Sequence, residues 1–593
     1  MRSLRPFLDA LRKEGDLVEI DAFCDPQLEI AEIHRRVIAA DGPALLFKKP
    51  VGGDFPVVTN LFGTKKRVEM AFGPRPAEFV RRAAELPHRL MPPSFGKLWE
   101  QRDFFYQGLS VGLRTVGSGP VMDVPSEPNL KKIPMLTCWE EDGGAFVTLP
   151  LVYTEHPTSG IHNLGMYRIQ RYDDRTTGVH WQIHKGGGYH YAEAERRGQA
   201  LPVNLFVGGP PGLILSAIAP LPENVPELIL ASLMIGDKLD RCANPAGPLP
   251  LIAECEFAIV GSVAPKVRRP EGPFGDHYGY YSLRHDYPVL DVARVFHRKD
   301  AIWPATVVGK PRQEDFYIGD YLQALLSPLF PVVMPAVRDL WSYGETGYHA
   351  LSAAVVQERY RREAMASAFR ILGEGQLSLT KFLLVLDTPR DLKDFRGTLE
   401  HVLARFQPET DLYVFSNLSM DTLDYAGPAV NEGSKGVMLG VGEPVRELLR
   451  RYQGSLPVGV RDAIPYCGGC LVVSGPAYVA EPGAASRLAD SFPGWQLVVL
   501  VDDAAVATRS DPRFLWTAFT RMEPAADLHG SRRMHRNHIV FEGPVVLDAR
   551  MKPTYPKELF CDSDTAALVS RRWDEYFPAR KVVMGDSGGA HLG

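Results

Sequence analysis

Short apolar runs of strand length constrain the fold of the middle of this chain most strongly. Three of them lie within residues 121–315: Phe146–Tyr153, Leu251–Val260 and Val289–Phe296. Runs of this length, bounded by Gly, Pro, Asn and Asp, are typical of β-strands. One helical stretch, near Glu227–Met234, interrupts them. The sequence therefore predicts a β-rich central domain.

Helix and strand signals alternate on both sides of this domain. A chain of 593 residues implies roughly three or four domains. Residues 1–120 mix a helical stripe with a short strand and predict an N-terminal α/β segment. Residues 316–443 predict an α/β domain, and residues 444–593 predict an extra α/β segment. The predicted fold is a mixed α+β and α/β multidomain protein.

The last two segments share a weak internal repeat. In the first copy, the apolar run Phe382–Asp387 ends in Asp and is followed by the motif Pro-x-x-Asp-Leu, which begins at Pro408. In the second copy, the apolar run Leu497–Asp502 ends in Asp and is followed by the same motif, which begins at Pro524. The distance from Asp to Pro is 21 residues in the first copy and 22 in the second. Generic βαβ patterning would produce much of this similarity, so duplication and chance both remain open.

Composition and charge narrow the partners and the compartment. Lys and Arg number 66 against 71 Asp and Glu, a net charge of −5 without a basic stripe, so we expect no nucleic-acid partner. No apolar run approaches the roughly 18 residues that span a bilayer, and the N-terminus reads as an amphipathic helix rather than a signal peptide. Seven cysteines with one close pair, Cys467 and Cys470, fit a reducing cytoplasm better than a zinc site.

The segment Glu271-Gly-Pro-Phe-Gly-Asp276 carries two carboxylates on a loop of Gly and Pro. Gly272 and Gly275 are able to take positive φ and Pro273 fixes φ, so the loop is predicted to be sharp and well defined. If both acids face one pocket, repulsion raises the pKa of one of them and makes it a proton donor. A surface turn with two solvated acids is the alternative interpretation.

A second group of polar residues lies upstream. Residues 162–170 and 179–188 flank the turn Asp173-Asp174 and predict a β-hairpin. If these two aspartates form the loop, Asn163 faces His184 across the pair, and a longer turn shifts that register.

Glu254 and Glu256 lie on one face of the predicted strand Leu251–Val260. An amide, an imidazole and a carboxylate suit Mn²⁺ or Mg²⁺ better than zinc. Three ordinary polar residues of a barrel are the alternative. Lys185, followed by three glycines, either lets the backbone approach a phosphate or belongs to a plain loop.

These motifs, in this order, resemble the UbiD family of decarboxylases. Asn163-Leu-Gly-Met-Tyr-Arg168, His184-Lys-Gly-Gly and Ala253-Glu254 precede the Glu271–Asp276 loop. Further motifs agree: Lys132-Ile-Pro134, Cys138-Trp-Glu-Glu-Asp142, Leu423-Asp-Tyr-Ala-Gly-Pro and Gly433-Ser-Lys435. The resemblance covers residues from about 1 to 443.

The resemblance implies a prenylated-FMN enzyme that reversibly decarboxylates an aromatic or α,β-unsaturated acid. It implies a central split β-barrel like that of flavin reductases, and places the oligomerisation domain at 316–443. It implies Mn²⁺, or Mg²⁺, bound by Asn163, His184 and Glu254, and allows K⁺ as a further ion. The implied cofactor contacts are Met166, Tyr167, Arg168, His180, Trp181, Gln182, Lys185, Gly186 and Lys435, together with the three metal ligands.

Arg168, Glu271 and Asp276 form the implied catalytic network, with Asp276 as proton donor. Some family members carry Glu at the donor position and Arg after the metal-binding His, where this chain has Asp276 and Lys185. A shorter acid reaches less far, and Lys cannot bind phosphate in the bidentate way that Arg does.

The resemblance also implies partners: an aromatic carboxylic acid as substrate, a UbiX-like flavin prenyltransferase as cofactor supplier, and homodimers or higher homo-oligomers. The roughly 150 residues after Lys435 resemble the long UbiD-like decarboxylases of the futalosine pathway of menaquinone synthesis. A prenylated substrate would bring peripheral membrane association.

Three function classes remain open. They are decarboxylation of a (prenylated) 1,4-dihydroxy-6-naphthoate or 4-hydroxybenzoate in quinone synthesis, a catabolic (hetero)aromatic acid decarboxylase or carboxylase, and a non-catalytic flavin-binding subunit. The intact acid–arginine network argues against the third, and architecture alone does not choose a substrate.

Overall fold

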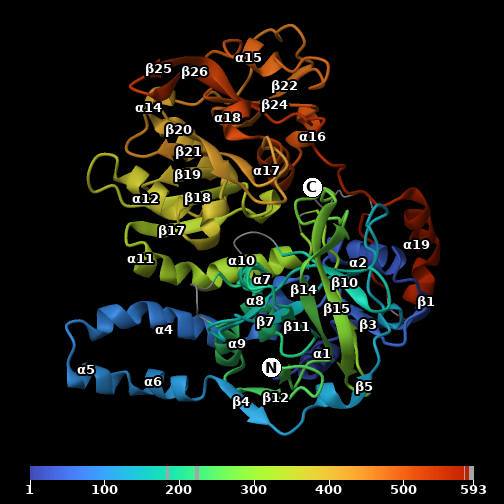
Figure 1. Cartoon of the computed structure of the whole chain (residues 1–593). Coiled ribbons are helices and arrows are strands. Elements are labelled where there is room, and N and C mark those ends of the chain that lie inside the picture. The colour runs from blue at the N-terminus through green and yellow to red at the C-terminus, as the bar shows by residue number, and fades with distance from the viewer. Residues whose placement is uncertain (182–185, 221–225, 311, 580, 587–593) are drawn as a thin grey trace. The chain divides into compact units, whose positions relative to one another are not determined.

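The chain folds into two compact units, shown in Figure 1 by a computed structural model that describes residues 1–181, 186–220, 226–310, 312–579 and 581–586. The first unit contains residues 1–325 and 558–586, and the second contains residues 326–557. The predicted boundary near 316 therefore lies close to the observed one. The predicted segment 444–593 divides, because its last residues return to the first unit.

The first unit begins with a small α/β layer. The predicted stripe of Leu4, Phe7, Leu8 and Leu11 becomes the buried face of α1 (Leu4–Lys13). Four strands form its sheet in the order β1-β2-β3-β16. They are β1 (Leu17–Cys24), β2 (Ala44–Pro50), β3 (Val57–Thr59) and β16 (Trp303–Pro304). Two helices complete this layer, α2 (Glu29–Ala39) and α3 (Lys65–Phe72).

A nine-stranded sheet forms the centre of the first unit and confirms the predicted β-rich region. Its order is β6-β9-β10-β15-β14-β11-β7-β8, and β5 pairs with β15. The strands are β5 (Val124–Ser126), β6 (Phe146–Val147), β7 (Leu151–Glu155), β8 (His162–Gly165), β9 (Ile169–Arg171), β10 (Thr176–Val179), β11 (Leu201–Val207), β14 (Phe257–Glu271) and β15 (His285–His297).

Two predicted strands are interrupted in the structure. The run Phe146–Tyr153 divides between β6 and β7, and the run Leu251–Val260 divides between β13 (Leu251–Ile252) and β14. Residues 253–256 form a turn between these last two strands, so Glu254 and Glu256 do not share one strand face. A third small sheet joins β13 to β12 (Leu239–Cys242) and β4 (Leu113–Val116).

Three helices cover parts of the central sheet. The predicted helix is α9 (Glu227–Ile235), and the sequence did not reveal α7 (Gly186–Arg196) and α8 (Gly212–Ile218). Glycine is a poor helix former, which explains why a helix that begins Gly186-Gly-Gly was not recognised. All three helices contact β8.

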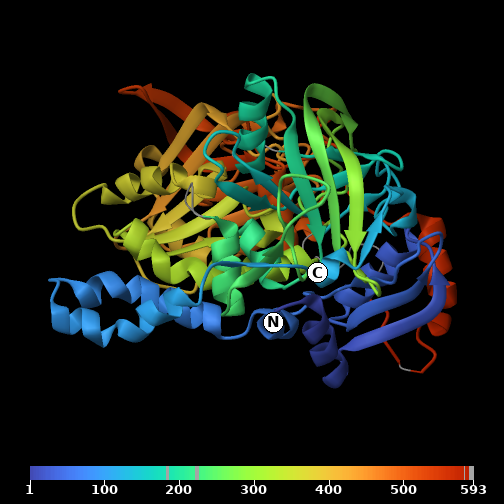
Figure 2. The same ribbon diagram turned by 60° about the horizontal axis from the view of Figure 1, so that its bottom comes forward.

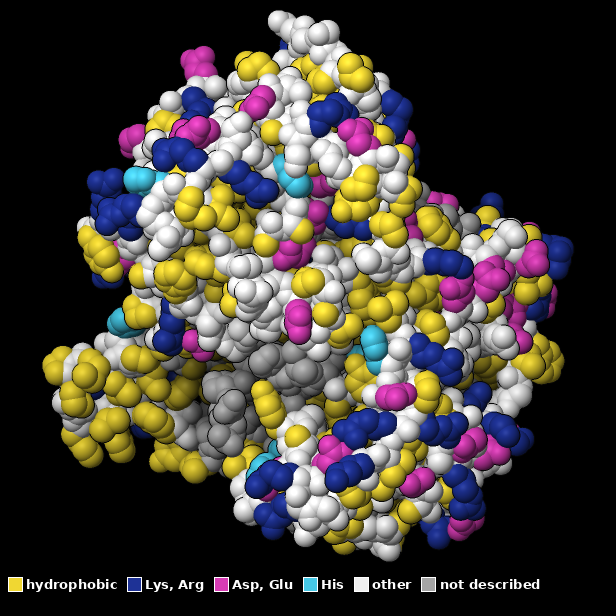
Figure 3. Space-filling model, turned by 45° about the horizontal axis from the view of Figure 1, so that its top comes forward, with side chains coloured by type: hydrophobic (Ala, Val, Ile, Leu, Met, Phe, Trp, Pro, Cys, Tyr) yellow, Lys and Arg dark blue, Asp and Glu magenta, His cyan; other side chains and the backbone are white. Residues whose placement is uncertain are grey.

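A helical arm projects from the first unit in Figures 1 and 2. It consists of α4 (Arg75–Leu90), α5 (Phe95–Glu100) and α6 (Arg102–Leu109). Large apolar side chains are exposed along it, and Figure 3 shows hydrophobic side chains gathered there at the lower left. They are Met91, Phe95, Leu98, Trp99, Phe105, Tyr106 and Leu109.

The second unit contains two five-stranded sheets. The first has the order β17-β18-β19-β21-β20 and the second β22-β23-β24-β26-β25. The strands of the first are β17 (Val337–Ser342), β18 (Leu351–Val356), β19 (Phe382–Leu386), β20 (Leu412–Ser419) and β21 (Glu432–Gly440). Those of the second are β22 (Asp462–Cys467), β23 (Cys470–Ser474), β24 (Leu497–Val501), β25 (Leu528–His535) and β26 (His538–Asp548).

The final helix, α19 (Ser563–Tyr576), returns to the first unit and contacts α2 and β1. Val569 and Trp573 join the core that the N-terminal layer shares with the central sheet. Tyr576 and Arg572 both donate to the carboxylate of Glu29 on α2.

All seven cysteines are free thiols. Within the described residues, the structure contains no helix that is both long and apolar enough to cross a bilayer.

Candidate active site

Arg168 is the centre of a buried ionic cluster in the first unit. It follows β8 and immediately precedes β9, and Glu271 is the last residue of β14. The guanidinium makes a bidentate pair with Glu271, at 2.8 and 2.9 Å, and a third contact of 2.5 Å to Asp276. It also donates to Ser282 Oγ at 2.9 Å. The structure thus brings together the three residues of the predicted catalytic network.

The loop between β14 and β15 carries the two acids and is fixed at two points. Gln170 accepts from the Gly272 N–H at 2.8 Å and donates to the carbonyl of Gly143. Asp142 accepts from the Gly275 N–H at 2.8 Å, next to Asp276. Both anchors are side chains from other segments, and they brace the start of the loop.

The two glycines of this loop serve different purposes. Gly272 has φ of +91°, the conformation predicted for it. Gly275 does not lie in the left-handed region. A Cβ at Gly275 would lie 2.0 Å from Cδ1 of Trp139, so close approach rather than backbone conformation explains this glycine.

The pKa of each acid lies below its ordinary value, which favours the ionised form and differs from the expectation that repulsion keeps one of them protonated. Burial alone would raise the pKa of Glu271, but the charge of Arg168 lowers it to about 2. Burial also opposes ionisation of Asp276, yet its pKa falls below the usual range through the His277 hydrogen bond and the charge of Arg168. The sequence alone did not show that one arginine lies between the acids.

Asp142 is a carboxyl near this loop whose pKa is raised. Burial raises it to about 7, although the backbone N–H groups of Gly275, Trp139 and Cys138 all donate to it. In the sequence, Asp142 stood out only as part of a family motif. It is a positioning residue for the loop, because its hydrogen bonds join Gly275 to the turn at Cys138 and Trp139.

His180 and Trp181 present unused polar atoms beside the acid cluster. His180 follows β10, and its Nδ1 lies 3.1 Å from Glu271 Oε2, which makes Nδ1 the protonated nitrogen while Glu271 is ionised. Burial, and then the charge of Arg168, lowers the pKa of His180 and keeps it neutral. His180 Nε2 and Trp181 Nε1 are buried without a hydrogen-bond partner among the described residues. A polar ligand would satisfy both atoms.

Asn163 lies on β8 next to the first turn of α7. Its amide donates to the Tyr167 hydroxyl at 3.3 Å, and the Gly187 N–H donates to the same hydroxyl at 3.1 Å. A Cβ at Gly186 would lie 2.0 Å from Asn163 Oδ1, so only glycine fits there. Met166 is half-buried in the segment between β8 and β9.

Glu227, rather than Glu254, lies beside Asn163. Glu227 begins α9, and its carboxylate accepts the N–H of Leu164, the residue after Asn163, at 2.9 Å. Glu254 lies before β14, which β11 and β7 separate from β8, and its carboxylate pairs with Arg298 at 2.6 Å. The predicted ligand Glu254 is therefore corrected.

Glu256 also has a structural partner. It is fully buried and makes a two-point pair with Arg5 of α1, at 2.9 and 2.7 Å. Glu254 was chosen from the Ala253-Glu254 motif and from interpreting residues 251–260 as one strand.

The predicted hairpin exists in a shorter form. β9 pairs with β10 so that Gly178 faces Gln170, one residue away from the predicted register. Asn163 is not part of it, because β8 pairs with β7, where Asn163 faces Thr154. Gln182, His184 and Lys185, which were also predicted to bind the cofactor or metal, lie outside the described residues.

Lys435 belongs to the second unit, in β21. It is buried, and its Nζ donates to the carbonyl of Thr380 at 2.9 Å. Burial lowers its pKa to about 8. The neighbouring Lys381 makes a buried ion pair of 2.6 Å with Asp424 of the Leu423-Asp-Tyr motif.

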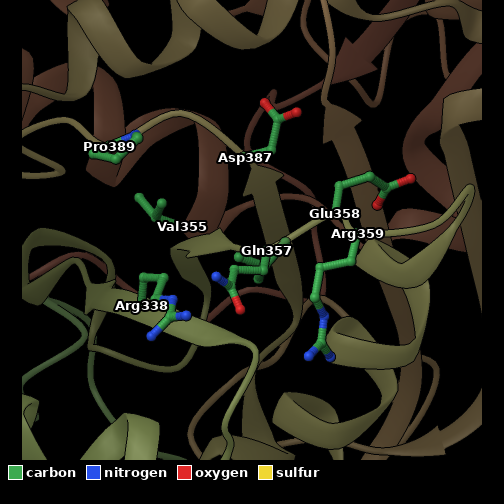
Figure 4. A pocket seen from close by; sticks show the side chains of 8 residues that line it. Arg338, Val355, Gln357, Glu358, Arg359, Asp387 and Pro389 are labelled. Atoms are coloured by element: carbon green, nitrogen blue, oxygen red, sulfur yellow. The ribbon is translucent and has the colours of Figure 1, made fainter.

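A separate cavity of about 560 Å³ lies in the second unit, where β18 and β19 end (Figure 4). Its acids already have structural roles. Asp387 accepts from the Gly442 N–H at 2.9 Å. Glu358 accepts from two backbone N–H groups at the start of α12 (Glu363–Leu372), those of the N-cap residue Arg362 and of Ala364.

The cluster around Arg168 defines a class of enzyme site. A buried arginine that holds two carboxylates is able to bind an anionic substrate and to place an acid next to it. The unused donor of Trp181 and acceptor of His180 fit a polar cofactor.

Comparison with known proteins supplies the family. Three family models match in order: the 3-octaprenyl-4-hydroxybenzoate carboxy-lyase N-terminal domain (residues 8–86), its Rift-related domain (114–311) and its C-terminal domain (316–440). The chain belongs to the UbiD family of carboxy-lyases and is a UbiD-type aromatic acid decarboxylase.

Two relatives illustrate the range of lengths. A Chlamydia pneumoniae protein, named as one of the subunits of a 4-hydroxybenzoate decarboxylase, is 50% identical over 591 residues, which is 98% of this chain and 100% of the relative. An Archaeoglobus fulgidus protein is 34% identical over 439 residues, 73% of this chain and 90% of its own length.

Solved structures agree with the fold. The vanillic acid decarboxylase of Sedimentibacter hydroxybenzoicus in closed form has a TM-score of 0.65 at 23% identity, covering 77% of this chain and 96% of its own. The UbiD-class enzyme HmfF of Pelotomaculum thermopropionicum, in complex with FMN, has a TM-score of 0.62 at 23% identity, covering 77% and 98%.

Proposed function

We propose that this chain decarboxylates an aromatic acid with prenylated FMN bound in the central sheet, which forms a split β-barrel. The observation that carries the proposal is the Arg168–Glu271–Asp276 cluster next to the unused polar atoms of His180 and Trp181. When bound, prenylated FMN would supply the electron sink that decarboxylation needs and that no side chain offers.

The protein residues have separate tasks in this proposal. Arg168 binds the substrate carboxylate, and Glu271 holds the guanidinium in place. Asp276 delivers a proton to the carbon that loses CO₂. Tyr167, Gly186 and Gly187 form a close-packed wall next to Asn163 that would hold the cofactor.

A phosphate-bearing cofactor fits the neighbourhood of Asn163. The N-terminal ends of α7 and α9 both approach β8, as the Gly187 and Glu227 contacts show. Helix N-termini carry partial positive charge and favour anions. Asn163, Glu227 and, from the sequence, His184 would hold a divalent Mn²⁺ or Mg²⁺ next to that phosphate, and K⁺ is a further candidate ion.

The proposed metal site has a matched test. Glu227→Gln removes a charged oxygen beside Asn163 and should weaken Mn²⁺ binding by roughly 10-fold or more. Glu254→Gln, which breaks only the pair with Arg298, should leave Mn²⁺ binding unchanged. Titration of the purified proteins with Mn²⁺, followed by electron paramagnetic resonance, measures both. Loss of binding in the Glu254 variant alone would restore the sequence-based assignment.

The cofactor requirement tests the proposed function itself. Protein produced with a UbiX-like flavin prenyltransferase should release CO₂ from an aromatic acid. Protein produced without it should have the same circular dichroism spectrum and no turnover, because the sheet core does not depend on the cofactor's reactive carbon. Turnover after reconstitution with plain FMN would contradict the proposal.

The proposed substrate is a (prenylated) 1,4-dihydroxy-6-naphthoate or a 4-hydroxybenzoate. The name of the Chlamydia pneumoniae relative supports a hydroxybenzoate. A catabolic (hetero)aromatic acid is the second candidate, supported by the fold shared with vanillic acid decarboxylase. Turnover of prenylated and unprenylated acids by the loaded enzyme separates them.

Peripheral membrane association would accompany a prenylated substrate. The arm of α4–α6 supports it, because exposed Phe, Trp, Tyr and Leu side chains lie next to basic ones, including Arg102 and Lys97. Co-sedimentation of the protein with anionic lipid vesicles is the direct measurement.

A further inference from the structure

The two sheets of the second unit have the same topology. In each, the first pair of strands is antiparallel, the next two pairs are parallel and the last pair is antiparallel. We call residues 337–442 the first repeat and residues 462–551 the second repeat.

Two hydrogen bonds recur at equivalent positions in the repeats. Asp387 follows β19 and accepts the N–H of Gly442, two residues after β21, at 2.9 Å. Asp502 follows β24 and accepts the N–H of Met551 at 2.8 Å. Gly442 and Met551 occupy equivalent positions. In the first repeat Leu386, just before Asp387, faces Gly440, and Gly442 follows two residues later. In the second repeat Leu500 faces Asp548, so the residue just before Asp502 is level with Ala549, and Met551 follows two residues later.

The second recurring bond lies in a short helix. Asp411 of α14 (Pro408–Asp411) accepts the N–H of Gln407 at 2.9 Å, and Asp527 of α18 (Pro524–Asp527) accepts the N–H of Glu523 at 2.6 Å. These are the Pro-x-x-Asp-Leu motifs noticed in the sequence. The similarity therefore extends from topology to single side chains.

The repeats contact one another reciprocally. α14 of the first repeat lies on β26 of the second, and α18 of the second lies on β21 of the first. α13 (Phe395–Arg405) lies on β22, and its counterpart α17 (Asp511–Thr520) lies on the turn after β17. Each contact from the first repeat to the second thus has a matching contact from the second repeat to the first. Such reciprocal contacts are those of two units related by an approximate two-fold axis, as in an isologous dimer.

The face between the repeats is apolar and aromatic. Phe519 of α17 lies 6.0 Å from Phe382 and 6.1 Å from Phe395, ring centre to ring centre. Phe395 also lies 6.1 Å from Phe514. All four rings are buried. Without the second repeat, the first would expose an aromatic face of the kind that marks protein–protein contacts.

Polar contacts at the edge of this face fix the register of the two repeats. Arg396 pairs with Asp511 at 2.7 Å and lies over the ring of Tyr466 at 4.4 Å. Glu400 accepts the N–H of Gly468 at 2.7 Å.

We propose that the second repeat is an in-chain partner that takes the place of a second copy of the first repeat. The Archaeoglobus relative aligns with 73% of this chain, and that alignment uses 90% of the relative's own length. The remaining tenth of the relative is too short to contain a complete second repeat. In this chain the second repeat covers the aromatic face of the first. A homo-oligomer of this chain would then use another surface.

The repeats are not equivalent in chemistry. Gly436 pairs with the first residue of β19, and Val545 pairs with the first residue of β24, so these two residues are equivalent. Counting back along the strands, Gly543 and Pro544 of the second repeat are equivalent to Ser434 and Lys435 of the first. The second repeat therefore lacks the buried amine. Instead, the Ala525 N–H of α18 donates to Ser434 Oγ at 2.8 Å and braces the strand that carries Lys435.

Photo-crosslinking in the full chain tests whether the contact lies within one chain. A chain with p-benzoylphenylalanine at Arg396 is co-expressed with a chain marked by Val479→Ile, a change at an exposed side chain. After irradiation and trypsin digestion, every crosslinked peptide of residues 462–487 should have the mass of the unmarked chain. A crosslinked peptide with the extra methylene of the marked chain would overturn the proposal, and so would the lack of any crosslink to the second repeat.

A pair of core variants tests whether the second repeat supports the first. Phe519→Ala removes the ring at the face, and Phe492→Ala removes a ring buried in the core of the second repeat itself. Hydrogen exchange of residues 382–386 and 395–405 should become roughly 10- to 100-fold faster in the Phe519 variant, because large-to-small changes destabilise the elements in contact. The Phe492 variant should leave those segments unchanged. Equal effects of both variants on the first repeat would refute the supporting role.

Discussion

Asp276→Asn should lower turnover by roughly 10²- to 10⁴-fold, the usual contribution of a general acid, while the substrate still binds. Asparagine keeps the shape of Asp276, but its single carbonyl oxygen can accept from Arg168 or from His277, not from both, and it has no acidic proton. Exchange of solvent deuterium into the product should fall in parallel. Steady-state kinetics and mass spectrometry of the product measure the two effects.

The low pKa of Asp276 gives this prediction a pH dependence. The pKa of Asp276 lies below its usual range in the structure, so a proton must arrive before the residue can donate one. A substrate carboxylate at Arg168 adds negative charge and raises that pKa, so binding should take up a proton. Affinity should therefore decrease as pH rises, and in the Asn variant this dependence should disappear.

The roles of the two acids are separable. If Asp276→Asn kept near-normal turnover while Glu271→Gln lost it, the proton donor would be Glu271. The structure favours the opposite assignment, because Glu271 uses both oxygens for Arg168 and also accepts from His180.

Arg168→Lys should abolish turnover and also destabilise the first unit. Lysine is a point charge and cannot contact Glu271 at two points while reaching Asp276 and Ser282. Lysine keeps the positive charge, so the loss of stability comes from the hydrogen bonds it cannot make to the buried acceptors. Thermal unfolding and turnover measure the two losses.

A matched control uses another arginine that makes a two-point pair with a buried acid. Arg5→Lys breaks the two-point contact with buried Glu256. Arg5 and Glu256 share no hydrogen bond with Arg168, Glu271 or Asp276 among the described residues. It should lower stability and leave turnover per folded molecule close to normal. If the Arg168 and Arg5 variants lost turnover equally, Arg168 would have a structural role alone.

Local motifs made much of the site predictable. Glu271 and Asp276 are close in the sequence, and the family resemblance placed Arg168 with them. Their charge did not follow, because it depends on Arg168 lying between them and on His277 turning back to Asp276. Such geometry has no signature in residue spacing.

Glu227 shows what a single sequence does not reveal. Its contact with Leu164 spans 63 residues and joins a helix start to an edge strand. An acid at the first position of an apolar helix is a usable signal, but it also fits ordinary helix capping. Glu254 was preferred because it belongs to the Ala253-Glu254 motif and because an apolar run concealed a turn. The fold was easier, since strand-length runs and the Pro-x-x-Asp-Leu repeat indicated both the central sheet and the paired sheets of the second unit.

The position of α19 has a consequence for synthesis of the protein. Val569 and Trp573 fill the core of the N-terminal layer, and Arg572 and Tyr576 satisfy Glu29. On the ribosome, the first unit therefore emerges without one of its own walls and stays incomplete while the whole second unit is translated. Domains usually fold in order from the N-terminus. Here the residues made first wait for residues made almost last, so a nascent chain that stalls before residue 563 leaves the apolar surface of α2 and β1 open to chaperones.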